Sequence, residues 1–190
     1  MASVITELRD KIRALVEDLE KTDTEVFPYE NSGIFILQEE NIQEITEATL
    51  NGVELNSGDY SFDSATNKLE ITVSGLASGD IIEVVYTYYK YSDTEIDGYI
   101  KASLIWLSIF DATEKDFEIE DGDIFPTPDN QEEDVIAIIA SILIKPNYSE
   151  YRLPNLTVRY PRKFSKEEKI ERLLNRWTRG LGVSDTLDFN

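Results

Sequence analysis

The spacing of apolar residues changes twice along the chain, and this change restricts the fold more than any other feature. Between residues 4 and 21, apolar side chains recur every three or four positions, as on one face of an α-helix. From Gly33 to Tyr91 the repeat is two, as in β-strands, and helical spacing returns after Ser92. The sequence therefore predicts an α+β fold, in which a helical core is interrupted by an inserted β domain.

Four helices make up the predicted core. They cover residues 4–21, 93–112 and 132–144 and a C-terminal segment that starts after Ser165. Capping boxes mark two of the starts, because Ser92 stands three residues before Glu95 and Ser165 stands three before Glu168. The second helix is apolar around almost its whole circumference between Tyr99 and Phe110, which is typical of a helix at the centre of a core.

The inserted β domain is predicted to be a small antiparallel sandwich or open barrel. Its expected strands are 33–37, 45–50, 53–55, 60–63, 69–73 and 81–91. Asn51-Gly52 indicates a two-residue hairpin turn, because both central positions of that turn need positive φ. We expect the domains to be 1–30 with 92–164 for the helical core, 31–91 for the β domain, and 165–190 for a C-terminal docking helix and tail.

Positive charge is concentrated near the C-terminus. Residues 145–179 hold ten of the 18 Lys and Arg residues and four acids, a net charge of +6, whereas residues 1–144 hold eight bases and 32 acids, a net charge of −24. This asymmetry predicts a basic segment that docks on an acidic partner. The predicted docking residues are Arg159, Arg162, Lys163, Lys169, Arg172, Leu173, Arg176, Trp177 and Arg179.

Two other interpretations of the basic segment are open. It is also what an ordinary amphipathic helix would look like if it folded onto the acidic body of its own chain. Nucleic-acid binding is disfavoured, because the large negative charge on the same chain repels phosphate.

The residue inventory argues against most catalytic classes. The chain has no His and no Cys, which removes the usual zinc ligands, the cysteine nucleophile and the histidine general base. We therefore expect no enzymatic activity and no cofactor, with an acidic-residue hydrolase as a remaining alternative. The longest apolar run, 135–144, is half of the roughly 20 residues that a membrane-spanning helix needs, so it predicts a buried core helix.

Two further clusters are candidate sites, each with a simpler explanation. The acidic stretch 118–123 offers hard oxygen ligands for a divalent cation, but it lacks the spacing of a calcium loop and is more typical of a solvated loop. The tyrosines of the β domain offer a stacking platform for a sugar or a base, but tyrosine is also an ordinary strand residue. They are Tyr60, Tyr86, Tyr88, Tyr89 and Tyr91.

The order of these elements resembles that of the head–tail adaptor (connector or head-completion) proteins of tailed bacteriophages. The resemblance rests on the amphipathic first helix, the capped apolar helix containing Tyr99-Ile100-Lys101-Ala102-Ser103-Leu104-Ile105, the apolar helix 132–144, and the basic, partly extended C-terminal segment. It covers residues 1–21 and 92–180. The β domain at 33–91 departs from it, because simpler members have a short loop there.

The resemblance implies a structural subunit of the phage neck, made in the host cytoplasm and carried in the virion. It implies a homo-oligomeric ring, usually of about twelve copies in that family, that joins the portal protein to a tail or stopper protein, with no membrane involved. Residues 165–179 would dock on the portal, and the ring would pass DNA without binding it specifically. The alternative is a tail, baseplate or surface module whose β domain binds a receptor or glycan.

Overall fold

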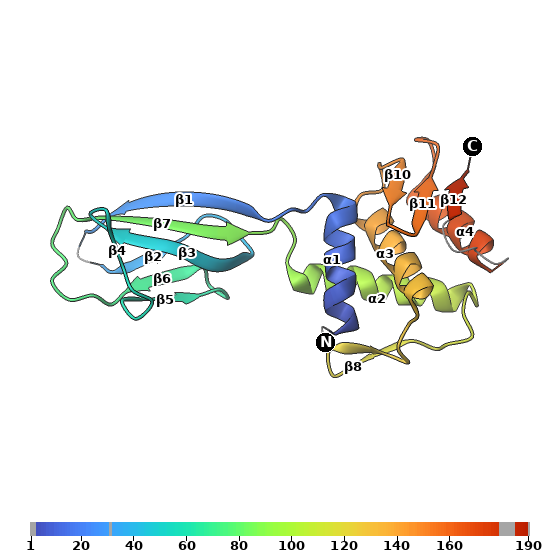
Figure 1. Ribbon diagram of the computed structural model, residues 1–190, viewed down its shortest axis with the longest axis horizontal. Coiled ribbons are helices and arrows are strands. Elements are labelled where there is room, and N and C mark those ends of the chain that lie inside the picture. Colours follow the sequence, from blue (N-terminus) through green and yellow to red (C-terminus); the bar gives the residue numbers. More distant parts are fainter. Residues whose placement is uncertain (1–2, 31, 179–184, 190) are drawn as a thin grey trace. The chain divides into compact units, whose positions relative to one another are not determined.

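The computed structural model describes residues 3–30, 32–178 and 185–189 of the chain. Within them the chain forms four helices and several antiparallel sheets, which confirms the predicted α+β fold (Figure 1). The helices are α1 (Val4–Val16), α2 (Asp93–Ile109), α3 (Asn130–Ile144) and α4 (Lys166–Trp177). Two compact units result: a helical unit, Met1–Asp18 with Asp93–Asn190, and a β unit, Leu19–Ser92.

Helix α3 is the central element of the helical unit. Every side chain from Val135 to Ile142 is buried, and the helix contacts α1, α2 and α4. Asp129 caps its start, accepting hydrogen bonds from the amides of Gln131 and Glu132 and so completing a capping box that was not predicted. The buried apolar run predicted for this segment is thus the core of the unit.

Charged groups fix α1 against its neighbours. Lys11 Nζ lies 2.8 Å from a Glu133 carboxylate oxygen and 2.9 Å from one of Asp134, both in the first turns of α3. On α2, Asp97 accepts two hydrogen bonds from the Arg9 guanidinium, at 2.8 and 2.6 Å. These contacts leave the apolar side of α1 directed into the core, as the helical spacing predicts.

Helix α1 is shorter than the sequence predicts. It ends at Val16 because Glu17 adopts left-handed φ of 55° and its amide closes back on the carbonyl of Ala14. Leu19, which continues the apolar repeat in the sequence, is 69% exposed. Residues 21–28, predicted to lie in the helical core, are instead a strand of the β unit.

The β unit contains two antiparallel sheets, one over the other (Figure 1). One has the order β1-β7-β3-β4 and the other β2-β6-β5. The strands are β1 (Lys21–Pro28), β2 (Ile34–Ile36), β3 (Ile42–Leu50), β4 (Val53–Glu54), β5 (Tyr60–Asp63), β6 (Lys68–Ile71) and β7 (Ile81–Tyr88). One apolar cluster combines residues of both sheets, including Phe35 and Leu69 from one and Ile82 and Val84 from the other.

Strand β1 lies at a sheet edge and was not predicted. It pairs along its whole length with β7, from Lys21 opposite Tyr88 to Pro28 opposite Ile81. Glu25 links β1 to the rest of the unit, because its carboxylate accepts hydrogen bonds from Tyr86 Oη at 2.5 Å and from the Gln38 amide at 2.8 Å. Burial, followed by this carboxylate, raises the pKa of the Tyr86 phenol. The β unit therefore starts at residue 19 and not at 31.

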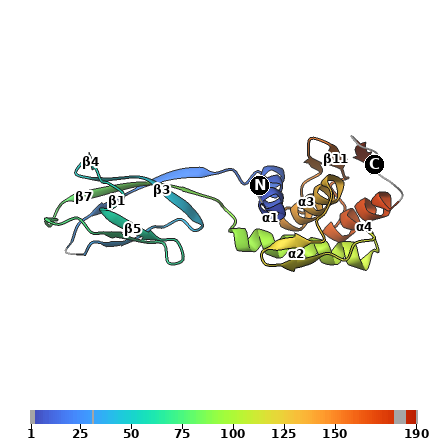
Figure 2. The same ribbon diagram turned by 60° about the horizontal axis from the view of Figure 1, so that its bottom comes forward.

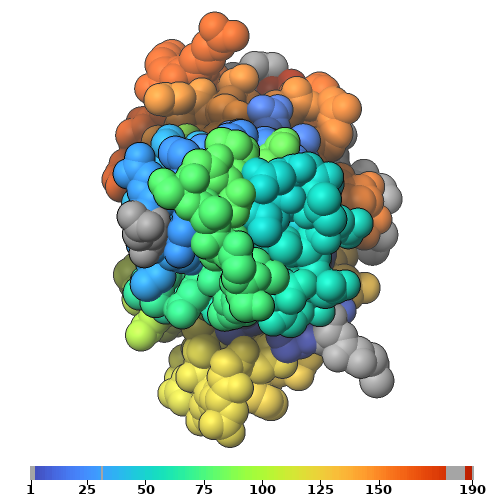
Figure 3. All heavy atoms as spheres, turned by 90° about the vertical axis from the view of Figure 1, so that its left-hand side faces the viewer, coloured from blue at the N-terminus to red at the C-terminus, as the bar shows by residue number. Residues whose placement is uncertain are grey.

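Three connecting segments meet at one end of the β unit. Asp80 accepts hydrogen bonds at 2.8 Å from the Asn51 side chain and from the Ala77 amide, and its own carbonyl accepts from the Tyr29 amide. Figure 3 shows two of these segments side by side, the β3–β4 turn in cyan and the loop before β7 in green. The turn is the predicted one, with φ of 53° at Asn51 and 77° at Gly52.

Two small sheets complete the helical unit. A hairpin of β8 (Glu118–Glu120) and β9 (Asp123–Phe125) follows α2. The other sheet has the order β10-β11-β12, and in the sequence β10 and β11 precede α4 while β12 follows it. The strands of that sheet are β10 (Glu150–Arg152), β11 (Leu156–Arg159) and β12 (Asp185–Asp188). Strand β12 pairs with β11 in parallel, although the sequence predicts only an acidic tail there.

Candidate docking surface

The basic segment begins with strands β10 and β11, whose alternation separates an inner from an outer face. Tyr151 and Val158 are opposite each other and buried, while Glu150 and Arg159 form an outward-facing cross-strand pair. Glu150 accepts hydrogen bonds from two guanidiniums, Arg152 at 2.8 Å and Arg159 at 3.3 Å. These bonds, led by that of Arg152, lower the pKa of the Glu150 carboxyl.

Helix α4 starts at the predicted capping box. Ser165 Oγ accepts from the Glu168 amide at 3.2 Å, and the Glu168 carboxylate accepts from the Ser165 amide at 2.8 Å. One side of the helix, with Ile170 and Leu174, is buried, while Arg172 is exposed on the other. The predicted separate docking arm is therefore part of the helical unit, because its apolar side packs into that unit.

Two predicted docking residues belong to the interior. Leu173 is completely buried with the apolar side of α4. Lys169 is also completely buried, and its ammonium donates to the carbonyl of Pro146 at 2.5 Å and to that of Tyr148 at 2.7 Å. Burial lowers the pKa of this lysine. Their assignment as partner-docking residues is wrong, because the helical spacing that places them on α4 also turns them inward.

Trp177 is also partly engaged in a contact within its own chain. Its indole N–H donates to the carbonyl of Ala112 at 2.8 Å, which ties the end of α4 to the segment after α2. The ring is half-buried, so only part of it is available to a partner. Lys145, another base of the segment, donates to the Val16 carbonyl at the end of α1 and to Tyr148 Oη.

Four of the predicted cations lie on the surface without a carboxylate within 4 Å among the described residues: Arg162 and Lys163, in the turn between β11 and α4, and Arg172 and Arg176 on α4. We call them the cationic surface. The Arg172 guanidinium lies over the Phe164 ring at 4.3 Å from its centroid, which holds it in place without neutralising it. Arg179 lies outside the described residues.

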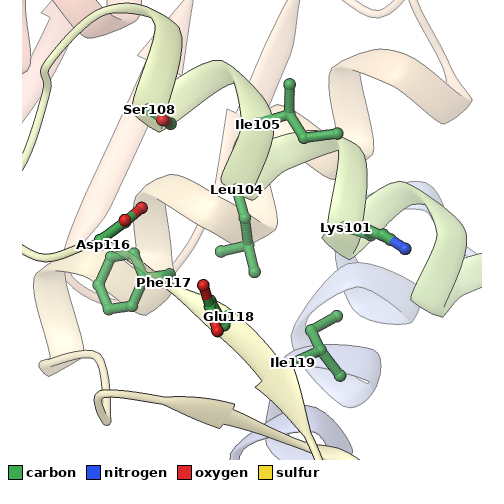
Figure 4. A pocket seen from close by; sticks show the side chains of 8 residues that line it. All are labelled: Lys101, Leu104, Ile105, Ser108, Asp116, Phe117, Glu118 and Ile119. Carbon is green, nitrogen blue, oxygen red and sulfur yellow. The ribbon is translucent and has the colours of Figure 1, made fainter.

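A groove beside helix α2 was missed from the sequence. It has a volume of about 400 Å³ and lies between α2 and the segment leading into β8 (Figure 4). Its lining residues are Lys101, Leu104, Ile105, Ser108, Asp116, Phe117, Glu118 and Ile119. Ile105 is 53% exposed and Ile109, one turn further on, 68% exposed. Helix α2 is therefore not the centre of the core, because one of its apolar sides faces outward. The signal in the sequence that could have indicated this exposed side is the apolar character of α2 around its whole circumference.

The other candidate clusters are placed as follows. The acidic stretch 118–123 forms the β8–β9 hairpin, and in the part of the chain that is described no group of three acidic side chains is arranged to hold a metal ion. Tyr86 is in the core of the β unit, so it is not available for stacking. Tyr88 and Tyr89 line an open hollow of about 530 Å³ in that unit with Lys21, Glu39 and Glu40 among others.

Comparison with known proteins gave no assignment: no family model matches this chain, and no curated protein matches it. Among the described helices, none is long and apolar enough to cross a membrane.

Proposed function

We propose that this chain is a structural subunit of the neck of a tailed bacteriophage. In this proposal, copies of the chain form a ring that joins the portal to the tail or stopper protein and lets DNA pass. The role is mechanical and not catalytic.

The observation that carries the proposal is the set of unneutralised cations on an otherwise acidic molecule. Arg172 and Arg176 stand one turn apart on the exposed side of α4, and neither has a carboxylate within 4 Å among the described residues. Exposed like charges placed together repel one another unless an acidic partner covers them. Arg172 and Arg176 therefore favour docking of their part of α4 on an acidic surface, which we assign to the portal.

The charge of the remaining molecule favours a channel over a nucleic-acid binder. The β unit has 14 acids and 3 bases, a net charge of −11. Phosphate is repelled by such a surface, so DNA that passes it stays mobile. The layout of helices in the sequence, with its likeness to head–tail adaptors, supports this assignment over other acidic assemblies.

The test is binding of the purified chain to the portal protein of the same phage at low and high salt. The variant Arg172→Glu/Arg176→Glu is expected to lose binding while its circular dichroism is unchanged. The control Lys21→Glu/Lys90→Glu makes the same charge change on exposed β-unit residues and is expected to bind normally. Wild-type protein that binds no portal at low salt would refute the proposal, as would normal binding by the α4 variant.

One observation favours a second candidate function, recognition of a glycan by the β unit. The hollow beside Tyr88 and Tyr89 combines aromatic rings with charged groups, a combination that suits a sugar ring and its hydroxyls. Binding on a glycan array that Tyr88→Ala abolishes would support this function. An array without any bound sugar would eliminate it.

A further inference from the structure

The groove beside α2 combines an apolar wall with carboxylates that have no base within 4 Å in the described part of the chain. Leu104, Ile105 and Phe117 contribute the apolar surface, and Asp116 and Glu118 stand at its rim. In Figure 4, Lys101 lies at one end of the groove and Asp116 at the other, with Glu118 between them. Such a groove suits a side chain with an alkyl stem and a cationic head that enters from the Asp116 end.

Acids extend beyond the groove itself. Six exposed carboxylates between residues 111 and 121 have no base within 4 Å among the described residues; they are Asp111, Glu114, Asp116, Glu118, Glu120 and Asp121. The one base in this stretch, Lys115, is engaged with Glu132 at 2.5 Å. The lining of the groove thus holds two carboxylates against one base, Lys101, and the acids beyond it add further negative charge.

The chain has cations that match this groove, Arg162 and Lys163 before α4, but they lie in another part of the helical unit. The amide of Ile5, in the first turn of α1, donates to Asp123 of the hairpin at 3.2 Å. Lys145 donates to the Val16 carbonyl in the last turn, and Lys169 ties the start of α4 to Pro146. The 13 residues of α1, roughly 20 Å at 1.5 Å per residue, thus separate the hairpin from the start of α4.

Arg162 and Lys163 immediately precede that start, in the turn closed by the Phe164 amide on the Pro161 carbonyl. Figures 1 and 2 agree with this geometry, since the β8–β9 hairpin and the β10–β12 sheet lie on opposite sides of α1 and α3. A separation of this size argues against contact of Arg162 and Lys163 with the groove of their own chain. Two complementary surfaces on opposite sides of one unit are what a head-to-tail contact between identical copies requires.

We propose that the turn Pro161–Phe164 of one copy docks in the α2 groove of the next copy, with Arg162 and Lys163 beside Asp116 and Glu118. This contact rests on the proposed function and identifies the subunit interface of the ring. It is distinct from the portal contact, which uses Arg172 and Arg176. Ile105 and Ile109 lose water when the contact forms, and repeated contacts of this kind close into a ring.

The absence of cysteine makes a direct test possible. Ser108→Cys places a thiol in the groove of one variant, and Lys163→Cys places one in the turn of another. A mixture of the two, assembled on the portal and treated with a short thiol cross-linker, is expected to give a cross-linked dimer. Either variant alone is expected to give none, because a head-to-tail contact brings Ser108 near Lys163 of another copy and not near a second Ser108.

Charge exchange provides the second readout. Asp116→Lys/Glu118→Lys is expected to weaken association of copies at least tenfold, and combination with Arg162→Glu/Lys163→Glu is expected to restore it. The control Glu44→Lys/Glu47→Lys changes exposed β-unit acids by the same charge and is expected to have no effect. Portal binding without the Ser108–Lys163 cross-link overturns this inference and leaves the proposed function intact. Failure of portal binding overturns both.

Discussion

Replacement of Lys169 tests whether a predicted docking residue is instead structural. The Lys169→Met variant keeps most of the apolar stem and removes two hydrogen bonds from a charged donor, each contributing about 1.5–3 kcal/mol. Loss of the desolvation penalty of the buried ammonium offsets part of this. The net loss of unfolding free energy is therefore expected to be about 2 kcal/mol, and Lys169→Ala, which also leaves a cavity, is expected to lose about 4 kcal/mol.

The assay is urea unfolding followed by tryptophan fluorescence. Trp106 and Trp177 both belong to the helical unit, so the signal reports on that unit alone. A loss of about 2 kcal/mol lowers the urea midpoint by roughly 1 M at an m value of about 2 kcal/mol/M. The control Lys166→Met, at an exposed position of the same helix, is expected to change stability by less than about 0.5 kcal/mol. An unchanged midpoint for Lys169→Met, together with lost portal binding, would refute the structural role.

Two further predictions concern the separate units. Arg13→Ala removes the guanidinium that lies 2.5 Å from the Asp18 carboxylate, whose side chain is 1% exposed. The variant is expected to reduce the unfolding free energy by about 3–5 kcal/mol in the same fluorescence assay. A loss below about 1 kcal/mol would contradict this prediction. In the β unit, hydrogen bonds from Ala77 and Asn51 lower the pKa of the Asp80 carboxyl in the folded state. As the pH falls, Asp80 is therefore protonated in the unfolded state before it is protonated in the folded state. The stabilisation that this carboxylate contributes at neutral pH is lost as the pH falls below about 4. Tyrosine circular dichroism across an acid titration measures this, and Asp80→Asn is expected to flatten that part of the profile; an unaltered profile would show that this carboxylate has no such role.

The sequence determined the local structure well where neighbouring residues supply the reason for it. The capping box of Ser165 and Glu168 and the Asn51-Gly52 turn are formed as predicted, because both depend on contacts within four residues. The change from helical to two-residue spacing predicted most of the strands and the α+β class, because this spacing is also a local property of the sequence.

Only the tertiary structure decided where each unit starts and which cations a partner can reach. Strand β1 exists because β7 supplies its hydrogen bonds, and that partner is distant in the sequence. Lys169 and Arg172 are three residues apart and carry the same charge, but the fold buries one against two carbonyls and leaves the other exposed. Charge is a property of the residue, whereas accessibility depends on how α4 packs. The groove beside α2 likewise depends on which side of that apolar helix the other helices leave uncovered.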